Sequence, residues 1–289
     1  MPRIRTSRSR DRLAEVLREC GELITPAETA RALDVNAAEA AQQLARWTAQ
    51  GWLKRLQRGV YTPVPIDARS AEQTLEDPWL LVPRVFAPGY VGGWTAAEHW
   101  ALTEQIFRVI CVFTARPFRD KRRTIGGVGF ALQRVQEDAI FGTQAIWRGR
   151  VRIAVSDPHR TLVDLLARPA TGGGIRHVAA CLRGYLARSD ADLARVLAYA
   201  DQLGVGTVFK RLGFLLERTR GDFAPIVEQC LGRITEGLSK LDPALASPRV
   251  VKRWRLRAPA SWLDGREGND ARSVRARQHG VTAAVTTAS

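Results

Sequence analysis

Cysteine and long apolar runs are scarce in this sequence, and each shortage excludes a class of protein. Its 289 residues include four cysteines, which stand far apart without a CxxC pair or a histidine at ligand spacing: Cys20, Cys111, Cys181 and Cys230. A disulfide framework and a zinc site are therefore excluded, and thiols that are buried or free in a reducing cytoplasm are expected. No run of about 18 uncharged apolar residues is present, so no membrane span is expected. The basic start leads into no apolar segment of the kind that a secretory signal needs.

Patterns typical of catalysis are also lacking. The segment Ser156-Asp157-Pro158 is interpreted as the start of a helix that places His159 in its first turn, with Leu162, Val163, Leu165 and Leu166 in the core. The glycines 172–174 are followed by no Gly-Lys-Ser or Gly-Lys-Thr, so they predict a loop rather than a phosphate site. The glycines at 126–129 interrupt a strand pattern and favour a bulge or a tight bend. The sequence therefore predicts no enzyme, no catalytic or metal-ligating residue and no cofactor.

Positive charge is abundant. Lysine and arginine number 44 against 29 aspartate and glutamate, which gives a formal net charge of +15. Such an excess favours nucleic acid as a partner, because lysine and arginine neutralise phosphates and release counterions. The excess is concentrated in three stretches, residues 1–62, 108–123 and 249–279. An arginine- and alanine-rich, methionine-poor composition is also typical of a GC-rich bacterial genome, so the distribution carries more weight than the total.

The first 66 residues predict a winged helix-turn-helix. A helix is expected over 9–20, with Leu13, Val16 and Leu17 on one face. Thr25 and Glu28 form a capping box that begins a second helix, and Asn36 and Glu39 form another that begins a third. Alternating residues from Trp52 to Thr62, with a turn at 57–59, predict the hairpin of a wing.

The third helix is expected to read base edges. Burial of Ala37, Ala41, Leu44, Ala45 and Thr48 would leave Asn36, Gln42, Gln43 and Arg46 facing a major groove. Amides of this kind pair with adenine and guanidinium groups with guanine. Phosphate contacts are expected from Arg10 and Arg12 before and within the first helix, and from Lys54, Arg55 and Arg58 on the wing. The alternative is that these are solvated positions on a three-helix unit used for protein contacts.

The rest of the chain predicts an α+β fold with a helical C-terminal half. Residues 67–77 form a polar linker, residues 78–263 a mixed domain, and residues 264–289 a disordered tail. Within the mixed domain, Thr95 is expected to cap a short helix and Ser156 a longer one. Strands are expected over 107–115, 124–135 and 144–155, the last as a hairpin about Arg148-Gly149.

Two basic clusters in this mixed domain are candidate accessory sites. The first contains Arg119, Lys121, Arg122 and Arg123, and the second contains Lys252, Arg253 and Arg255. Each is interpreted as a solvated loop, a contact with DNA phosphates or a contact with an acidic protein surface.

Three segments resemble a known family. They are Leu56–Tyr61, Tyr90–Gln105, and Val155–Leu166 followed by Arg168-Pro169 and three glycines. In this order they resemble the AbiE-type antitoxin family (AbiEi) over about residues 8–263. The resemblance implies a repressor that binds inverted repeats in its own promoter. It also implies an antitoxin that counters a nucleotidyltransferase-type toxin encoded next to it.

Three hypotheses follow. The first is a sequence-specific repressor of its own operon that also acts as an antitoxin, with double-stranded DNA and a cognate toxin as partners. The second is an interaction module that binds and silences a partner enzyme, with DNA binding secondary. The third, a nucleic-acid enzyme, is disfavoured because no cluster of metal-binding carboxylates is evident.

Overall fold

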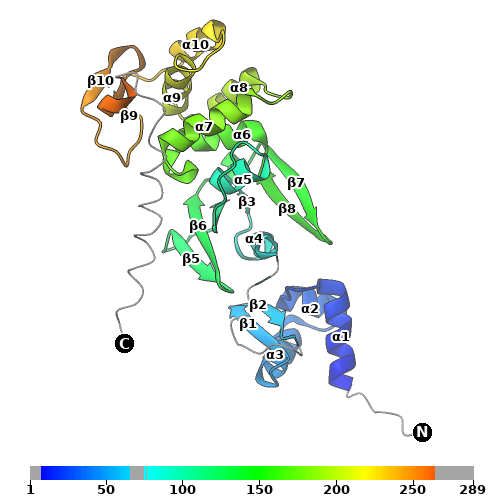
Figure 1. Ribbon diagram of the computed structural model, residues 1–289. Coiled ribbons are helices and arrows are strands. Elements are labelled where there is room, and N and C mark those ends of the chain that lie inside the picture. Colours follow the sequence, from blue (N-terminus) through cyan, green and yellow to red (C-terminus); the bar gives the residue numbers. More distant parts are fainter. Residues whose placement is uncertain (1–7, 66–74, 76, 264–289) are drawn as a thin grey trace, which may run out of the picture. The chain divides into compact units, whose positions relative to one another are not determined.

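The chain folds into two units of mixed α+β structure, divided between Val205 and Gly206 (Figure 1). The computed structural model describes residues 8–65, 75 and 77–263. The α+β prediction is confirmed, whereas the division inside the expected 78–263 domain was not anticipated. The expected linker, residues 67–77, lies outside the described residues except for Leu75 and Asp77, and the expected tail, residues 264–289, lies wholly outside them.

The first unit begins with three helices and a hairpin, as predicted. These are α1 (Arg8–Cys20), α2 (Pro26–Leu33), α3 (Ala37–Ala49), β1 (Leu53–Gln57) and β2 (Val60–Pro63). A small core joins them, because Val16, Leu44 and Trp47 are fully buried against one another and against Tyr61. Ile24 forms an antiparallel bridge with Tyr61, so the loop before α2 lies beside the wing. This arrangement is a winged helix-turn-helix.

A six-stranded sheet follows, with the strand order β5-β6-β4-β3-β8-β7. Its strands are β3 (Gly89–Val91), β4 (Val109–Thr114), β5 (Arg122–Ile125), β6 (Val128–Arg134), β7 (Thr143–Arg148) and β8 (Val151–Ser156). The pairs β4–β6 and β3–β8 are parallel, and the other three pairs are antiparallel. Gly126 and Gly127, both at positive φ, form the tight bend between β5 and β6. A bulge or bend within one strand over 124–135 was predicted there, but the glycines form a tight hairpin turn that divides this segment into two antiparallel strands.

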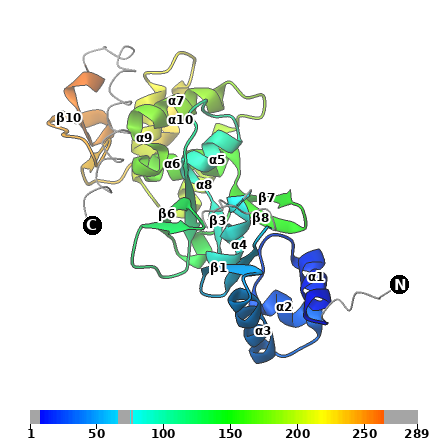
Figure 2. The ribbon, with the colours of Figure 1, turned by 60° about the horizontal axis from the view of Figure 1, so that its bottom comes forward.

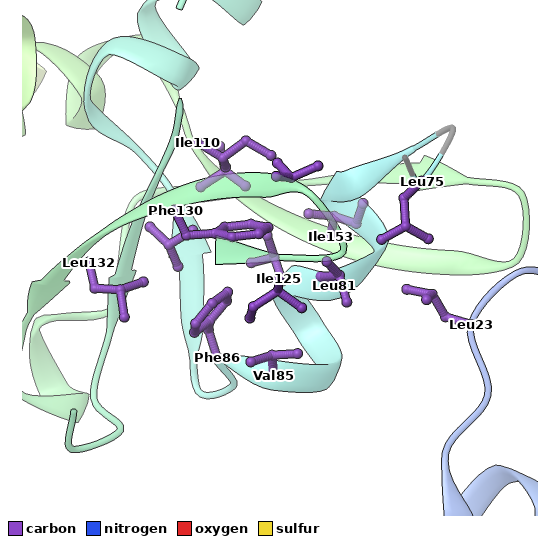
Figure 3. Packing of buried hydrophobic residues seen from close by; sticks show 14 of the residues in the cluster. Leu23, Leu75, Leu81, Val85, Phe86, Ile110, Ile125, Phe130, Leu132 and Ile153 are labelled. Carbon is purple, nitrogen blue, oxygen red and sulfur yellow. The ribbon is translucent and has the colours of Figure 1, made fainter. Parts of the chain in front are cut away.

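Both faces of the sheet are buried, which explains the continuous apolar run of β4. Ile110 and Val112 point into one hydrophobic cluster, while Cys111 and Phe113 point into another. Side chains of a strand alternate between faces, so a strand covered on both sides is apolar throughout. The first cluster also contains Leu81, Val85 and Phe86 around the short helices η1 (Pro78–Leu80) and α4 (Leu81–Val85) (Figure 3).

The winged helix shares this first cluster with the sheet. Leu23, before α2, and Val60, on the wing, belong to the same group of buried residues as Leu81 and Ile153, and Figure 3 shows Leu23 at the edge of this group. Figures 1 and 2 place α4 between the winged helix and the sheet. The winged helix therefore packs on the sheet and is not held by a linker alone.

Helices lie on the other face of the sheet in two layers, because two of them contact the strands and two pack on a helix of the first layer. They are α5 (Gly93–His99), α6 (Pro158–Ala167), α7 (Ile175–Leu186) and α8 (Leu193–Leu203), with the 3-10 turns η2 (Glu137–Ala139) and η3 (Pro169–Gly172). Two predicted caps are wrong. Thr95 lies inside α5, where its hydroxyl accepts a hydrogen bond from the Cys111 amide, and Gly92 is the N-cap. Ser156 is the last residue of β8, and Asp157 caps α6 by accepting from the Arg160 amide at 2.7 Å.

The second unit contains two helices that pack against each other, and a small three-stranded sheet. It contains α9 (Thr207–Leu216), α10 (Ala224–Leu231), β9 (Ser239–Lys240), β10 (Arg249–Val251) and β11 (Leu256–Ala258), with the turns η4 (Lys252–Trp254) and η5 (Ala260–Trp262). Trp254 is fully buried over Gly213 of α9. A Cβ atom at Gly213 would lie 1.9 Å from the Trp254 ring, so this close contact requires glycine.

All four cysteines have free thiols, and Cys111, Cys181 and Cys230 are buried. Burial raises the pKa of Cys181 and Cys230 to about 12, so both thiols stay protonated at neutral pH. In the described part of the chain, no helix has both the length and the apolar character to cross a membrane.

Candidate nucleic-acid interface

The two helices of the helix-turn-helix are set by their caps. The Thr25 hydroxyl accepts from the Glu28 amide, while the Glu28 carboxylate accepts from the Thr25 amide at 3.0 Å, which completes the predicted capping box. Asp34 ends α2 in the left-handed conformation. Asn36 then begins α3 by accepting from the Glu39 amide at 2.9 Å. Only this half of the second capping box is seen among the described contacts, and it occupies the carbonyl group of the Asn36 side chain.

The exposed face of α3 differs from the predicted one. Ala40, Leu44 and Trp47 are fully buried. Ala37, Ala41 and Ala45, which were expected in the core, are exposed, and Thr48 is half-buried. The bulky Leu44 and Trp47 determine which face turns inward, whereas alanine is small enough to tolerate either environment.

This rotation changes which side chains could reach a groove. Gln42 and Arg46 are exposed, and so is Asn36 at the start of the helix. Gln43 is half-buried beside the core and is the predicted base-reading residue that the fold places least favourably. The exposed alanines around Gln42 and Arg46 have short side chains, so this face of the helix can approach a bulky partner closely.

The wing places two arginines in solvent. β1 and β2 pair antiparallel from Leu53–Pro63 to Gln57–Val60, with a register shift between Arg55 and Gln57. Gly59 adopts a positive φ in the turn. Arg55 and Arg58 are exposed, whereas Lys54 is half-buried.

The two arginines predicted to contact phosphates from the first helix lie in different surroundings, and Arg10 is exposed. The Arg10 guanidinium lies over the Trp52 ring, 5.5 Å from its centroid, and Arg12 is half-buried. Ser9 accepts a hydrogen bond from the Trp47 indole at 3.0 Å, which ties the start of α1 to the core side of α3. Arg10 is therefore held against the wing by a cation–π contact.

A basic strand lies next to the wing, and sequence reasoning did not place it there. The guanidinium of Arg123, on the edge strand β5, donates to the Gln57 side chain of β1 at 3.3 Å. The Cβ position of Gly126, in the turn after β5, is 3.2 Å from the Leu56 side chain. We call the exposed side chains of this segment the β5 basic strip: Arg119, Lys121, Arg122 and Arg123. Asp120 is the acidic residue within it.

The second basic cluster belongs to the second unit and is partly neutralised. Arg253 pairs with Glu217 at 2.8 Å and with Glu228 at 3.3 Å. Lys252 is exposed, and Arg255 is half-buried with a positive φ. Because Arg253 already has two carboxylate partners, it is a weaker candidate for a phosphate contact than the β5 basic strip.

A buried polar network in the first unit escaped the sequence reading. Arg160 and Asp164, one turn apart on α6, form an ion pair at 3.0 Å with both side chains fully buried. The Tyr90 hydroxyl donates to Asp164 at 2.9 Å, and Arg160 also donates to the carbonyl oxygens of Ala139 and Phe141. Burial raises the pKa of the Asp164 carboxyl, and the Arg160 guanidinium opposes that rise. The network joins β3, α6 and the loop before β7.

Metal ligands do not extend this candidate interface. In the residues that the structure describes, no group of three or more His, Cys, Asp or Glu side chains could hold a metal ion.

No family model and no curated protein match the chain. A solved structure, the RV2827C protein from Mycobacterium tuberculosis, matches with a TM-score of 0.57 and 17% sequence identity, covering 90% of this chain and 94% of that one. A likeness at this identity shows a common fold over most of both chains.

Proposed function

We propose that this chain binds double-stranded DNA through α3 and the wing, and represses transcription of its own operon. We further propose that it acts as the antitoxin of a toxin–antitoxin pair, countering a nucleotidyltransferase-type toxin encoded beside it. The observation that carries the DNA-binding part is the exposed face of α3, where Gln42 and Arg46 stand among exposed alanines.

The geometry fits the docking mode of helix-turn-helix proteins. In that mode the second helix of the pair enters the major groove, and flanking groups bind phosphates. Amide and guanidinium side chains such as Gln42 and Arg46 can pair bidentately with adenine and guanine. Arg55 and Arg58 on the wing carry positive charge without an ion-pair partner among the contacts that the structure describes, which suits phosphate contacts.

Charge next to the wing supports the same proposal. The β5 basic strip is joined to the wing through Arg123 and Gln57, so a duplex on the wing would pass close to four further cations. The net charge of +15 favours association with any polyanion. This charge explains affinity, whereas α3 has to supply the preference for one sequence.

The antitoxin part rests on the resemblance of the three sequence segments. Tyr90 and Arg160, which lie in two of those segments, meet in the buried network. Those segments therefore form a structural centre of the first unit, and the resemblance is carried by residues that hold this fold together.

A mobility-shift titration tests the DNA-binding part. The duplex probe is the region just upstream of the gene for this chain, and the comparison is a random duplex of equal length. Specific binding of at least about 10³-fold over the random duplex is expected at physiological salt. Equal affinity for the two probes would overturn the repressor proposal.

Co-expression tests the antitoxin part. The neighbouring gene product is produced with and without this chain, and growth is measured. We expect growth arrest by the neighbour alone and relief by the full chain. Persistent arrest in the presence of the chain, or no arrest by the neighbour, would overturn the antitoxin part and leave the DNA-binding part standing.

A further inference from the structure

The hairpin β7–β8 forms one edge of the sheet. Its six register pairs run from Thr143–Ser156 to Arg148–Val151, and Gly149 adopts a positive φ in the two-residue turn. β8 pairs with β3 at a single position, Val155 with Val91, so most of the hairpin extends past β3 (Figure 1). The outer side of β7 faces no strand among the described residues. An edge of this kind has backbone donors and acceptors available for a partner.

One face of the hairpin anchors it to the molecule. Ile146 and Val151 pack against the first hydrophobic cluster, and Ile153 is fully buried in it. The Arg148 guanidinium lies over the Trp79 ring at 5.6 Å and 3.6 Å from the Asp77 carboxylate. These contacts hold the hairpin in place, so its other face is presented in a fixed geometry.

The other face exposes a tryptophan among arginines. Trp147 is 65% exposed, whereas the remaining seven tryptophans of the chain are buried or half-buried. Arg152 lies directly opposite Trp147 in the antiparallel register, and Arg150 stands exposed in the turn. Residues 139–156 contain no aspartate or glutamate. The face therefore combines one large apolar side chain with two arginines, Arg150 and Arg152, that form no ion pair among the contacts the structure describes.

We propose that this face of the β7–β8 hairpin docks a protein partner whose surface has an apolar pocket ringed by carboxylates. Trp147 would enter the pocket, and Arg150 and Arg152 would pair with the carboxylates. Tryptophan and arginine are enriched among residues that dominate binding energy at protein interfaces. The proposal rests on the proposed function in one respect, namely that the partner to be tested is the product of the neighbouring gene.

Two other occupants fit this face less well. A DNA duplex would attract the arginines, but its bases are stacked on one another and offer no site for an indole outside the helix. A second copy of this chain would bring Arg150 and Arg152 close to their own like charges, which disfavours a symmetric contact. An acidic protein surface satisfies both the indole and the guanidinium groups.

The test measures binding of the purified neighbouring gene product to the full chain by calorimetry. Trp147→Ala and the double variant R150E/R152E should each weaken binding by about tenfold or more. Ile106→Ala, at an apolar side chain that is 81% exposed elsewhere, should leave the affinity unchanged. R122E, in the β5 basic strip, should also leave this affinity unchanged while weakening binding to the upstream duplex.

The remaining outcomes overturn the proposal. They are no binding of the neighbouring product to the wild type, equal binding by Trp147→Ala and the wild type, or weaker binding of Trp147→Ala to duplex or single-stranded DNA. A wild-type dimer that Trp147→Ala dissociates in sedimentation would assign the face to a second copy instead. Binding to the upstream duplex is measured in parallel for every variant, so a failure here is distinguishable from a failure of the repressor proposal.

Discussion

Arg84 of α4 and Glu28 of α2 form an ion pair at 2.9 Å, with the Arg84 side chain 9% exposed and the Glu28 side chain 22% exposed. The same Glu28 carboxylate accepts hydrogen bonds from both the amide and the hydroxyl of Thr25. One side chain therefore caps the first helix of the helix-turn-helix and ties it to the helix that lies against the sheet.

Replacing Arg84 by Met should destabilise the first unit by about 1–3 kcal/mol, because it leaves the Glu28 carboxylate half-buried without its cation. Urea unfolding of the full chain measures the effect. Glu28→Gln is the matched control, since glutamine retains one carbonyl oxygen that can accept from Thr25 while losing the charge, and it should cost less. Wild-type stability in Arg84→Met would show that the pair contributes nothing.

The exposed face of α3 predicts a difference between two neighbouring glutamines. Gln42→Ala and Arg46→Ala should each reduce discrimination between the upstream duplex and a random duplex by about 1–3 kcal/mol. Gln43→Ala should leave discrimination intact, because Gln43 is half-buried beside the core. Competition binding at fixed salt measures all three. The reverse order would mean that another face of α3 enters the groove.

Removing the β5 basic strip should weaken binding to all duplexes alike. With Arg119, Lys121, Arg122 and Arg123 replaced by Ala, the slope of log K against log salt should become shallower by about 0.9 for each lost phosphate contact. Preference for the upstream duplex should persist, because these residues lie outside α3. Arg195→Ala, an exposed arginine on α8, is the control for charge alone. An unchanged slope would show that the β5 basic strip does not contact DNA phosphates.

Gly213→Ala should destabilise the second unit by about 3 kcal/mol or more, because the added methyl group would overlap the Trp254 ring within a packed core. Hydrogen exchange of residues 206–263 reports on this unit directly. Gly237→Ala is the matched control, since a Cβ atom there meets nothing within 4 Å. Similar protection in the two variants would contradict the close contact at Trp254.

Acidification should destabilise the fold through His177. Its Nδ1 donates to the Gly172 carbonyl at 2.5 Å, and its Nε2 lies 2.7 Å from the Thr103 hydroxyl, from which the neutral ring accepts a hydrogen bond. Burial lowers the pKa of His177, and the hydrogen bond to Gly172 opposes that change.

The sign of this pH effect follows from proton linkage. Below about pH 6.5 the unfolded chain takes up a proton at this histidine while the folded chain does not, which favours unfolding. The contribution of His177 is therefore complete above that pH and declines as the pH falls. Between pH 7 and pH 5, the free energy of unfolding should fall less steeply with decreasing pH for His177→Gln than for the wild type. Burial also lowers the pKa of His99, so part of the slope should remain. Parallel curves would exclude His177 as a source.

Local patterns in the sequence predicted the winged helix well. Caps, glycines and periodicity set the ends of α1, α2 and α3 and the turn of the wing to within a residue or so. The inward face of α3 was predicted wrongly because Ala37, Ala41 and Ala45 fit a buried stripe as well as an exposed one. The size of Trp47 was the usable signal, since a large aromatic residue in a small unit is seldom left in solvent.

Tertiary contacts explain what the sequence could not provide. The spacing of Arg160 and Asp164 suggests an ordinary helical ion pair, and nothing local indicates that α6 is buried on every side. Similarly, Arg123 and Gln57 stand 66 positions apart, and only the fold brings the basic strand to the wing. Thr95 was a reasonable cap by residue type, but β3 ends at Val91 and the helix already starts at Gly93, with Gly92 as its N-cap.

The presence of Leu23 and Val60 in the cluster beneath the sheet has a consequence for inheritance. A fragment cut near residue 65 would expose both side chains to water and leave the rest of the cluster without part of its cover. Recombination that moved this winged helix onto a foreign partner would carry the same defect. The winged helix and the sheet are therefore expected to be inherited together. Substitutions where they share this cluster are expected to occur in compensating pairs.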